Sequence, residues 1–159
     1  MILKHMKRRH SRADALRFCA DLRRARPDIV FGADLIAGFP TETDAMFENT
    51  LALIEDCGLT YLHVFPFSPR PGTPAARMPQ LASGLVKERA RLLREAGAAA
   101  LRRHLDTQIG KRLALLTERG GIARAEDFTK VRIAGCDAGQ MIEAKISGHD
   151  GEALFAGIG

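Results

Sequence analysis

Residues 31–43, FGADLIAGFPTET, decide the fold of the first part of the chain. An apolar run ends at Gly38, and a proline and a polar cluster follow it. A helical pattern at 43–57 ends before Gly58, and a second apolar run, TYLHVFPF, occupies residues 60–67. Strand, helix and strand in this order predict a βαβ unit, whose parallel strands must be covered by helices.

Further helices are expected on both sides of this unit. Ser11 and Asp14 form a start signal for a helix that Pro27 ends. A long helix is predicted at 83–105, after a loop at 68–80 that carries four prolines. On a helical wheel the apolar side of the first helix comprises Ala15, Phe18, Leu22 and Ala25.

The pattern changes after residue 105. Short strand-like runs replace the helical period, and Asp150-Gly151 is a preferred hairpin turn pair. Such runs predict a small closed barrel of the oligonucleotide-binding type, so we expect one domain at 1–105 and an all-β domain at 106–159. The predicted strands are 111–118, 129–134, 140–147 and 152–157.

Composition limits the class of protein. A hydrophobic content of 46% and a charged content of 27% are typical of a soluble globular domain. No apolar run is long enough to span a membrane, and MILKHMKRRH lacks the apolar centre of a signal peptide, so we expect a cytoplasmic protein. Residues 1–27 contain nine Lys/Arg and two Asp, a net charge of +7, and the remainder has a net charge of −2.

The cysteines and histidines indicate no metal site. Cys19, Cys57 and Cys136 are far apart, and their spacing fits neither a zinc site nor an iron–sulfur cluster. The five histidines have no ligand spacing either, and no nucleophile–base arrangement can be argued. We therefore assign no catalytic and no metal-binding residue.

Two parallel strands do not make a stable sheet by themselves. Residues 1–105 offer only two convincing strands. We therefore expect this segment to be part of a larger parallel barrel. Either the earlier strands of that barrel are supplied from elsewhere, or this chain is a fragment.

Two polar segments follow the predicted strands, at 38–43 and 67–73, where α/β barrels place their chemistry. Gly38 would let a ligand approach the backbone, because it has no Cβ. Arg70 lies between two prolines, which favours a guanidinium aimed at a carboxylate or phosphate. Thr41 and Asp44 fit a capping box, and for Glu42 and Thr43 capping and ligand binding stay open.

The chain contains, in this order, LKHMKRRHSR at 3–12, DLIAGFPTET at 34–43, HVFPFSPRPGTPAARMPQ at 63–80 and GQMIEAKISGHDG at 139–151. The ordered set resembles the radical S-adenosylmethionine methylthiotransferases of the MiaB/MtaB type. These enzymes add a methylthio group to a hypermodified adenosine beside the tRNA anticodon. The third segment is more similar to the branch acting on N6-threonylcarbamoyladenosine than to the isopentenyladenosine branch.

The resemblance implies that residues 1–105 are the last part of a radical SAM TIM-like barrel and that 106–159 are an OB-like TRAM domain. It also implies S-adenosylmethionine and [4Fe–4S] clusters as cofactors, with the cluster ligands in N-terminal domains missing from this chain. Three scattered cysteines cannot hold those clusters, so we expect the chain to be inactive alone. The implied partner is the anticodon region of tRNA.

Site residues are carried over from the family position by position. The implied cofactor-binding residues are Arg8, Ile36, Gly38, Glu42, Phe67 and Ser68. The implied substrate-binding residues are Arg70, Lys111, Arg112, Phe128, Arg132 and Lys145.

Two alternatives stay open at this point. A related enzyme modifies a ribosomal protein instead of tRNA, and the net charge of −1 in residues 106–159, unusual for an RNA-binding surface, keeps that alternative. The other alternative is a stand-alone module that binds nucleic acid or protein without catalysis.

Overall fold

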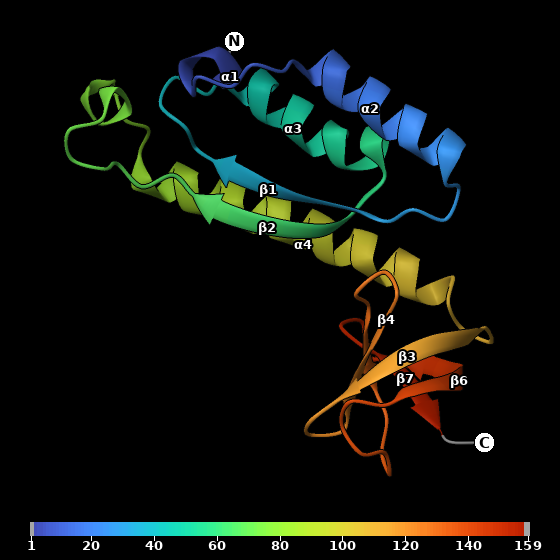
Figure 1. The fold of residues 1–159 in the computed structure, drawn as a ribbon. Coiled ribbons are helices and arrows are strands. Elements are labelled where there is room, and N and C mark those ends of the chain that lie inside the picture. Colours follow the sequence, from blue (N-terminus) through green and yellow to red (C-terminus); the bar gives the residue numbers. More distant parts are fainter. Residues whose placement is uncertain (1, 158–159) are drawn as a thin grey trace. The chain divides into compact units, whose positions relative to one another are not determined.

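The computed structural model describes residues 2–157, which form two compact units, Met1–Ala100 and Leu101–Gly159 (Figure 1). The division falls inside the long helix α4 (Ser83–Asp106), whereas the sequence placed the boundary after that helix. None of the helices in the described part of the chain is long and apolar enough to cross a membrane. The other elements of the first unit are α1 (Ile2–His5), α2 (Arg12–Ala25), β1 (Phe31–Ala37), α3 (Asp44–Cys57), β2 (Leu59–Pro66) and the 3₁₀ helix η1 (Pro74–Arg77).

The predicted βαβ unit is confirmed. β1 and β2 pair in parallel, and α3 connects them. α3 begins after Thr43, whose hydroxyl accepts a hydrogen bond from the backbone of Met46, and it ends at Gly58 in the left-handed conformation. Within residues 2–157 this sheet has two strands.

The two faces of the sheet differ. Alternate β1 residues, from Phe31 to Ala37, join the apolar core together with side chains of α2, α3 and α4. The intervening residues therefore lie on the other face, where Phe65 is 52% exposed. We call this the open sheet face. Its residues are the cross-strand pairs Gly32 with Tyr61, Asp34 with His63 and Ile36 with Phe65.

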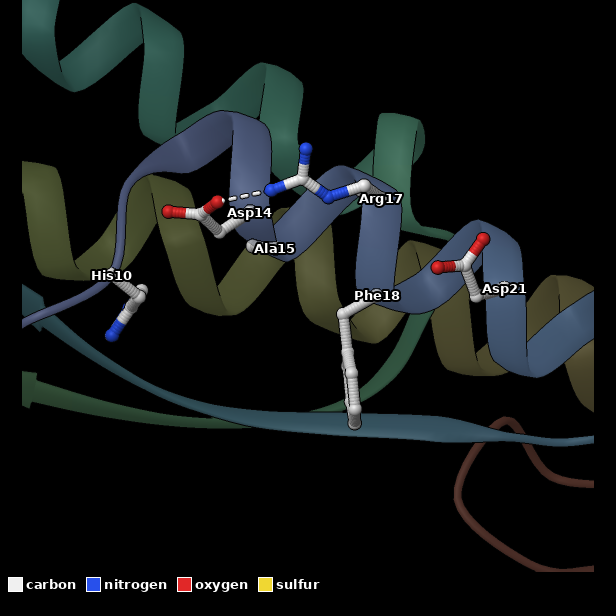
Figure 2. Close-up of a pocket in the computed structure, with 6 residues that line it drawn as sticks. All are labelled: His10, Asp14, Ala15, Arg17, Phe18 and Asp21. Atoms are coloured by element: carbon white, nitrogen blue, oxygen red, sulfur yellow. Dashed lines mark hydrogen bonds and ion pairs between the residues drawn. The ribbon is translucent and has the colours of Figure 1, made fainter.

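Helix α2 has the predicted start but a different buried side. Ser11 and Asp14 form the capping box. Phe18, however, is 62% exposed and lines a pocket on the outside of the helix (Figure 2). The prediction for Phe18 is wrong because the packed stripe centres on Cys19, one position further along. The α2 residues in the core are Ala15, Leu16, Cys19 and Leu22.

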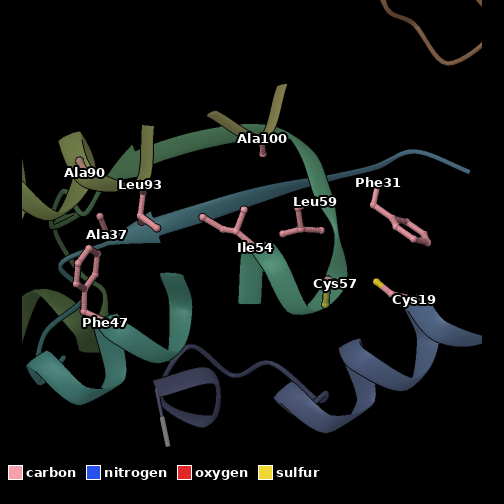
Figure 3. Packing of buried hydrophobic residues seen from close by; sticks show 10 residues of the cluster. All are labelled: Cys19, Phe31, Ala37, Phe47, Ile54, Cys57, Leu59, Ala90, Leu93 and Ala100. Carbon is pink, nitrogen blue, oxygen red and sulfur yellow. The ribbon is translucent and has the colours of Figure 1, made fainter. Parts of the chain in front are cut away.

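The core of the first unit combines apolar side chains of α2, β1, α3, β2 and α4 (Figure 3). Ile54 of α3 and Leu93 of α4 are among its fully buried side chains. Cys19 and Cys57 are buried in it as free thiols. Burial raises the pKa of the Cys57 thiol to about 11, and a hydrogen bond with Cys19 acts in the same direction. The two buried thiols therefore pack as small apolar side chains.

Helix α4 packs closely on the end of β1. Gly38 has a φ of 76°, and a Cβ built on it would lie 2.7 Å from Cγ2 of Val86. This contact accounts for the glycine by packing, whereas the sequence suggested ligand access. Gly97 similarly allows close approach to Leu62 of β2.

The second unit is a closed barrel of five strands in the order β3-β4-β5-β7-β6. The predicted hairpin is confirmed, since β6 and β7 pair antiparallel around Asp150, whose carboxylate accepts from the backbone of Glu152 and Ala153. The sequence missed β4 altogether. The strands are β3 (Arg112–Glu118), β4 (Ile122–Ala125), β5 (Lys130–Arg132), β6 (Met141–His149) and β7 (Leu154–Gly157).

The half-buried carboxylate of Asp127 stabilises the turn between β4 and β5. Nε2 of His104 lies 2.9 Å from the Asp127 carboxylate, and the backbone N–H of Thr129 donates to the same carboxylate at 2.9 Å. Burial by itself would raise the pKa of Asp127, but the hydrogen bonds from His104 and Thr129 outweigh it and lower the pKa to about 2. The ionised carboxylate therefore stabilises the second unit.

Replacing Gly38 by alanine should lower the free energy of unfolding by about 2–4 kcal/mol, because alanine disfavours this φ and its Cβ overlaps Val86. Gly84→Ala is the matched control, since a Cβ at Gly84, a helical residue, meets nothing within 4 Å. Urea unfolding of both variants measures the difference. Equal stabilities would contradict the packing described for Gly38.

Replacing Asp127 by asparagine should flatten the acid dependence of stability. The pKa of Asp127 is lowered from 3.8 to about 2, so its contribution is complete above pH 3.8 and is lost as the pH falls through 2. The contribution amounts to at most about 2 kcal/mol. Unfolding curves of the wild-type and Asp127→Asn proteins between these pH values measure it, and parallel pH profiles would show that the carboxylate does not contribute.

Candidate functional site

The two polar segments predicted from the sequence meet at the carboxyl end of the parallel sheet. The backbone N–H of Phe67 donates to the carbonyl of Ala37 at 2.8 Å, which joins the end of β2 to the end of β1. The rings of Phe39 and Phe67 are in edge contact, with centroids 5.2 Å apart. We call residues 38–43 the β1 turn, and it is the centre of the candidate site.

A buried ion pair lies beneath the β1 turn. Glu42 and Arg89 are 5% and 3% exposed. Oε2 of Glu42 accepts hydrogen bonds from the backbone N–H of Gly38 at 2.9 Å and from Nη1 of Arg89 at 2.8 Å. The same Nη1 donates to the backbone carbonyl of Glu42 at 2.9 Å. Protein groups therefore hold Oε2 of the carboxylate.

Arg89 has two further contacts. Its Nη2 donates to Asp44 at 2.5 Å, and its guanidinium lies 5.3 Å from the centre of the Phe47 ring. The sequence did not single out Arg89, because α4 contains several arginines. A helical wheel could have identified it, since Arg89 lies three residues after Val86 and four before Leu93, on the packed side of the helix.

The predicted capping box of Thr41 and Asp44 is wrong. Thr43 caps α3, and Asp44 pairs with Arg89. Thr41 instead has a φ of 72°, a left-handed conformation that is unfavourable for threonine. Its hydroxyl lies 3.5 Å from Nδ1 of His5.

The remaining cofactor candidates lie in different parts of the first unit. Ile36 is on the open sheet face, next to Phe65. Arg8 and Ser68 are exposed, as is Arg70, whose carbonyl accepts from the backbone N–H and hydroxyl of Thr73. A cofactor role for each of these residues, and for Gly38, Glu42 and Phe67, stays a prediction.

Most of the basic residues in α2 are not available for a ligand. Arg23 donates to the carbonyl of Cys57 at 3.0 Å and lies over the ring of Phe31. Other arginines form ion pairs with acidic side chains, and these pairs are Arg12–Asp56, Arg17–Asp14, Arg24–Asp21 and Arg26–Asp28. These pairs involve four of the nine basic residues in the N-terminal segment.

The barrel candidates form two groups. Arg112 of β3 and Lys145 of β6 are direct cross-strand partners on the outside of the barrel. Like charges in this arrangement repel each other, which favours a bound anion between them. Lys111 precedes this pair, and its Nζ lies 3.4 Å from the side-chain oxygen of Gln108.

The second group comprises Phe128 and Arg132, and Phe128 is 78% exposed in the β4–β5 turn with a φ of 65°. Arg124 donates to its carbonyl at 3.3 Å. Arg132 is further along β5 and pairs with Asp150 at 3.1 Å. The sequence did not predict the exposed cross-strand pair of Leu116 and Met141 on the neighbouring strands.

The described residues fit the implied cofactors only in part. Within residues 2–157 no group of three His, Cys, Asp or Glu side chains could hold a metal ion, so the iron–sulfur clusters find no ligands there. Ile36 and Phe65 offer an apolar surface suited to an adenine ring. For Glu42, one carboxylate oxygen, Oε2, already accepts hydrogen bonds from Gly38 and Arg89.

No protein-family model matches the chain. Curated proteins do. The threonylcarbamoyladenosine tRNA methylthiotransferase MtaB of Rickettsia prowazekii is 52% identical over 93% of this chain, which corresponds to 35% of that protein. Two tRNA-2-methylthio-N(6)-dimethylallyladenosine synthases, from Cereibacter sphaeroides and Ruegeria pomeroyi, are 42% and 34% identical over 96% of the chain and 37% of their own length.

The chain thus spans about a third of the length of the curated relatives that it matches. The similarity extends through both units, from the βαβ unit to the barrel, because each alignment includes more than nine-tenths of the chain. The chain is therefore similar to part of the tRNA methylthiotransferases that these names describe.

Proposed function

We propose that this chain is part of a longer tRNA methylthiotransferase that adds a methylthio group to N6-threonylcarbamoyladenosine beside the anticodon by radical S-adenosylmethionine chemistry. The observation that carries the proposal is the 52% identity to an MtaB protein over 93% of the chain, against 42% and 34% for the two dimethylallyladenosine synthases. Identity therefore favours the threonylcarbamoyl substrate over the dimethylallyl one.

In this proposal the first unit completes a radical SAM barrel. The last two strands of such a barrel, taken without the others, would form a two-stranded parallel sheet with helices on one face. The first unit has this arrangement. The open sheet face, with Ile36 and Phe65, would then line the barrel interior, where these side chains contact the adenine ring. Arg8 would bind the carboxylate of S-adenosylmethionine, and Phe67, Ser68 and Arg70 would lie at the mouth of the site.

S-adenosylmethionine, when bound, supplies the one-electron chemistry, and residues outside this chain would hold the clusters it requires. The residues of this chain would bind and orient the cofactor and exclude water from it. Because the described residues contain no cluster ligands, the chain by itself should lack activity.

A complementation experiment tests the proposed function. The complete gene should be expressed in a bacterial strain that lacks its own threonylcarbamoyladenosine methylthiotransferase. Mass spectrometry of tRNA nucleosides should then show the methylthio derivative of threonylcarbamoyladenosine. A methylthio group on isopentenyladenosine or on a ribosomal protein would refute the substrate, and no methylthiolation of any of them would refute the function.

The barrel would bind the tRNA. Phe128 supports this role, because an aromatic side chain so exposed is available for stacking on an unpaired base, and Arg124 lies next to it. The Arg112–Lys145 pair would contact phosphates on another part of the barrel. The Arg112–Lys145 pair supports this role even though residues 106–159 carry a net charge of −1.

Replacing Phe128 by alanine in the complete protein should weaken tRNA binding by about tenfold, the loss expected for one stacked base. Phe18→Ala is the matched control, because Phe18 is also an exposed phenylalanine but lies on α2. Filter binding at fixed salt measures both affinities. Equal affinities of the two variants would exclude Phe128 from the RNA contact.

A further inference from the structure

We propose that Arg89 is a positioning residue for the cofactor, acting through Glu42 on the backbone at the end of β1. The inference rests on the proposed function, since it takes the β1 turn to be next to S-adenosylmethionine. It gives Arg89 a role that the sequence did not suggest, and it changes the role of Glu42 from a direct ligand to part of a support.

The burial of Arg89 indicates a specific task. A guanidinium at 3% exposure has lost nearly all of its hydration, which is costly unless each donor finds a partner. Arg89 finds Glu42 twice, at the carboxylate and at the backbone carbonyl, and Asp44 once. Two of these three bonds go to one residue of the β1 turn, so the guanidinium connects α4 to that turn.

Glu42 connects the guanidinium to the end of β1. Its Oε2 accepts from the N–H of Gly38, and the carbonyl of Ala37 accepts from the N–H of Phe67. These two groups belong to the same peptide unit, because Gly38 follows Ala37 directly. Both ends of that peptide plane are therefore held, one by the Glu42–Arg89 pair and the other by the loop after β2.

The turn needs such a support because its backbone is strained. Thr41 has a φ of 72°, a conformation that costs threonine about 1–2 kcal/mol, whereas glycine adopts the φ of 76° at Gly38 without such a cost. Glu42 follows Thr41 directly. The ion pair with Arg89 compensates the cost and selects one conformation of the turn.

The consequence for the cofactor is geometric. Ile36 precedes the fixed peptide by one residue and lies on the open sheet face. Phe67 begins the loop bonded to that peptide. Rotation of the peptide plane would move both residues that are proposed to contact S-adenosylmethionine, so loss of Arg89 should weaken cofactor binding without removing any atom that touches the cofactor.

A double-mutant cycle in the complete, anaerobically purified protein tests this role. The variants are Arg89→Met, Glu42→Gln and the combination of the two, and the readout is the dissociation constant of S-adenosylmethionine measured by equilibrium dialysis. Arg91→Met is the matched control, because Arg91 lies two residues along the same helix and pairs with Glu88 and Glu95 on its exposed side. Thermal unfolding of every variant reports on folding.

Arg89→Met should weaken cofactor binding by about tenfold, the loss usual for an outer-shell partner, whereas Arg91→Met should leave it unchanged. The double variant should bind no more weakly than Arg89→Met, because both changes break the same connection. In turnover measurements the KM for S-adenosylmethionine should rise more than kcat falls. Arg89→Lys keeps the charge but loses the bidentate geometry. Compared with Arg89→Met, it should therefore recover more of the thermal stability than of the affinity for S-adenosylmethionine.

Two results would overturn the inference. One is a folded Arg89→Met protein with wild-type affinity. The other is an equal loss of affinity from Glu42→Gln with and without Arg89, which would show that Glu42 contacts the cofactor directly. If Arg89→Met does not fold, the Arg89→Lys and double variants decide by the same criteria. A wild-type protein that does not bind S-adenosylmethionine would overturn the proposed function itself, before any variant is compared.

Discussion

Parallel pairing of β1 with β2 is the constraint on which the first unit depends. Parallel strands end at the same edge of a sheet, so the pairing brings the segments after them together, although about thirty residues separate Gly38 from Phe67. It also requires the connecting helix α3, and it directs the apolar side chains of three helices to one face. The other face is left with a polar pair, Asp34 and His63, and an apolar pair, Ile36 and Phe65.

Much of this arrangement could be predicted because the signals are local. Capping by Ser11, the left-handed Gly58 and the alternation in β6 each depend on a few neighbouring residues. The errors arose where packing decides. Phe18 fits an apolar wheel but lies outside, and β4 has only four residues behind a Gly-Gly pair, too few to show a period.

The candidate site shows the same limit more clearly. The sequence identified the β1 turn, because glycine, proline and threonines mark it, but it could not identify what lies beneath. Arg89 is 47 residues from Glu42, and only the tertiary fold brings them together. The same holds for Val86, whose contact with Gly38 gives that glycine a reason in packing. For a residue such as Gly38, whose type fits both close packing and ligand access, the structure is therefore needed to distinguish the two explanations.

The two buried thiols could be used to measure local opening of the first unit. Cys19 and Cys57 belong to α2 and α3, and the pKa of Cys57, about 11, leaves almost no thiolate in the closed state at neutral pH. Because both thiols are buried, an alkylating reagent should react with them mainly in locally opened forms, so the labelling rate depends on the opening rate or on the opening equilibrium constant multiplied by the intrinsic reaction rate. The less buried Cys136 lies in the second unit. Peptide mapping after a pulse of reagent would thus follow the local stability of the first unit in the natural sequence, without an introduced probe.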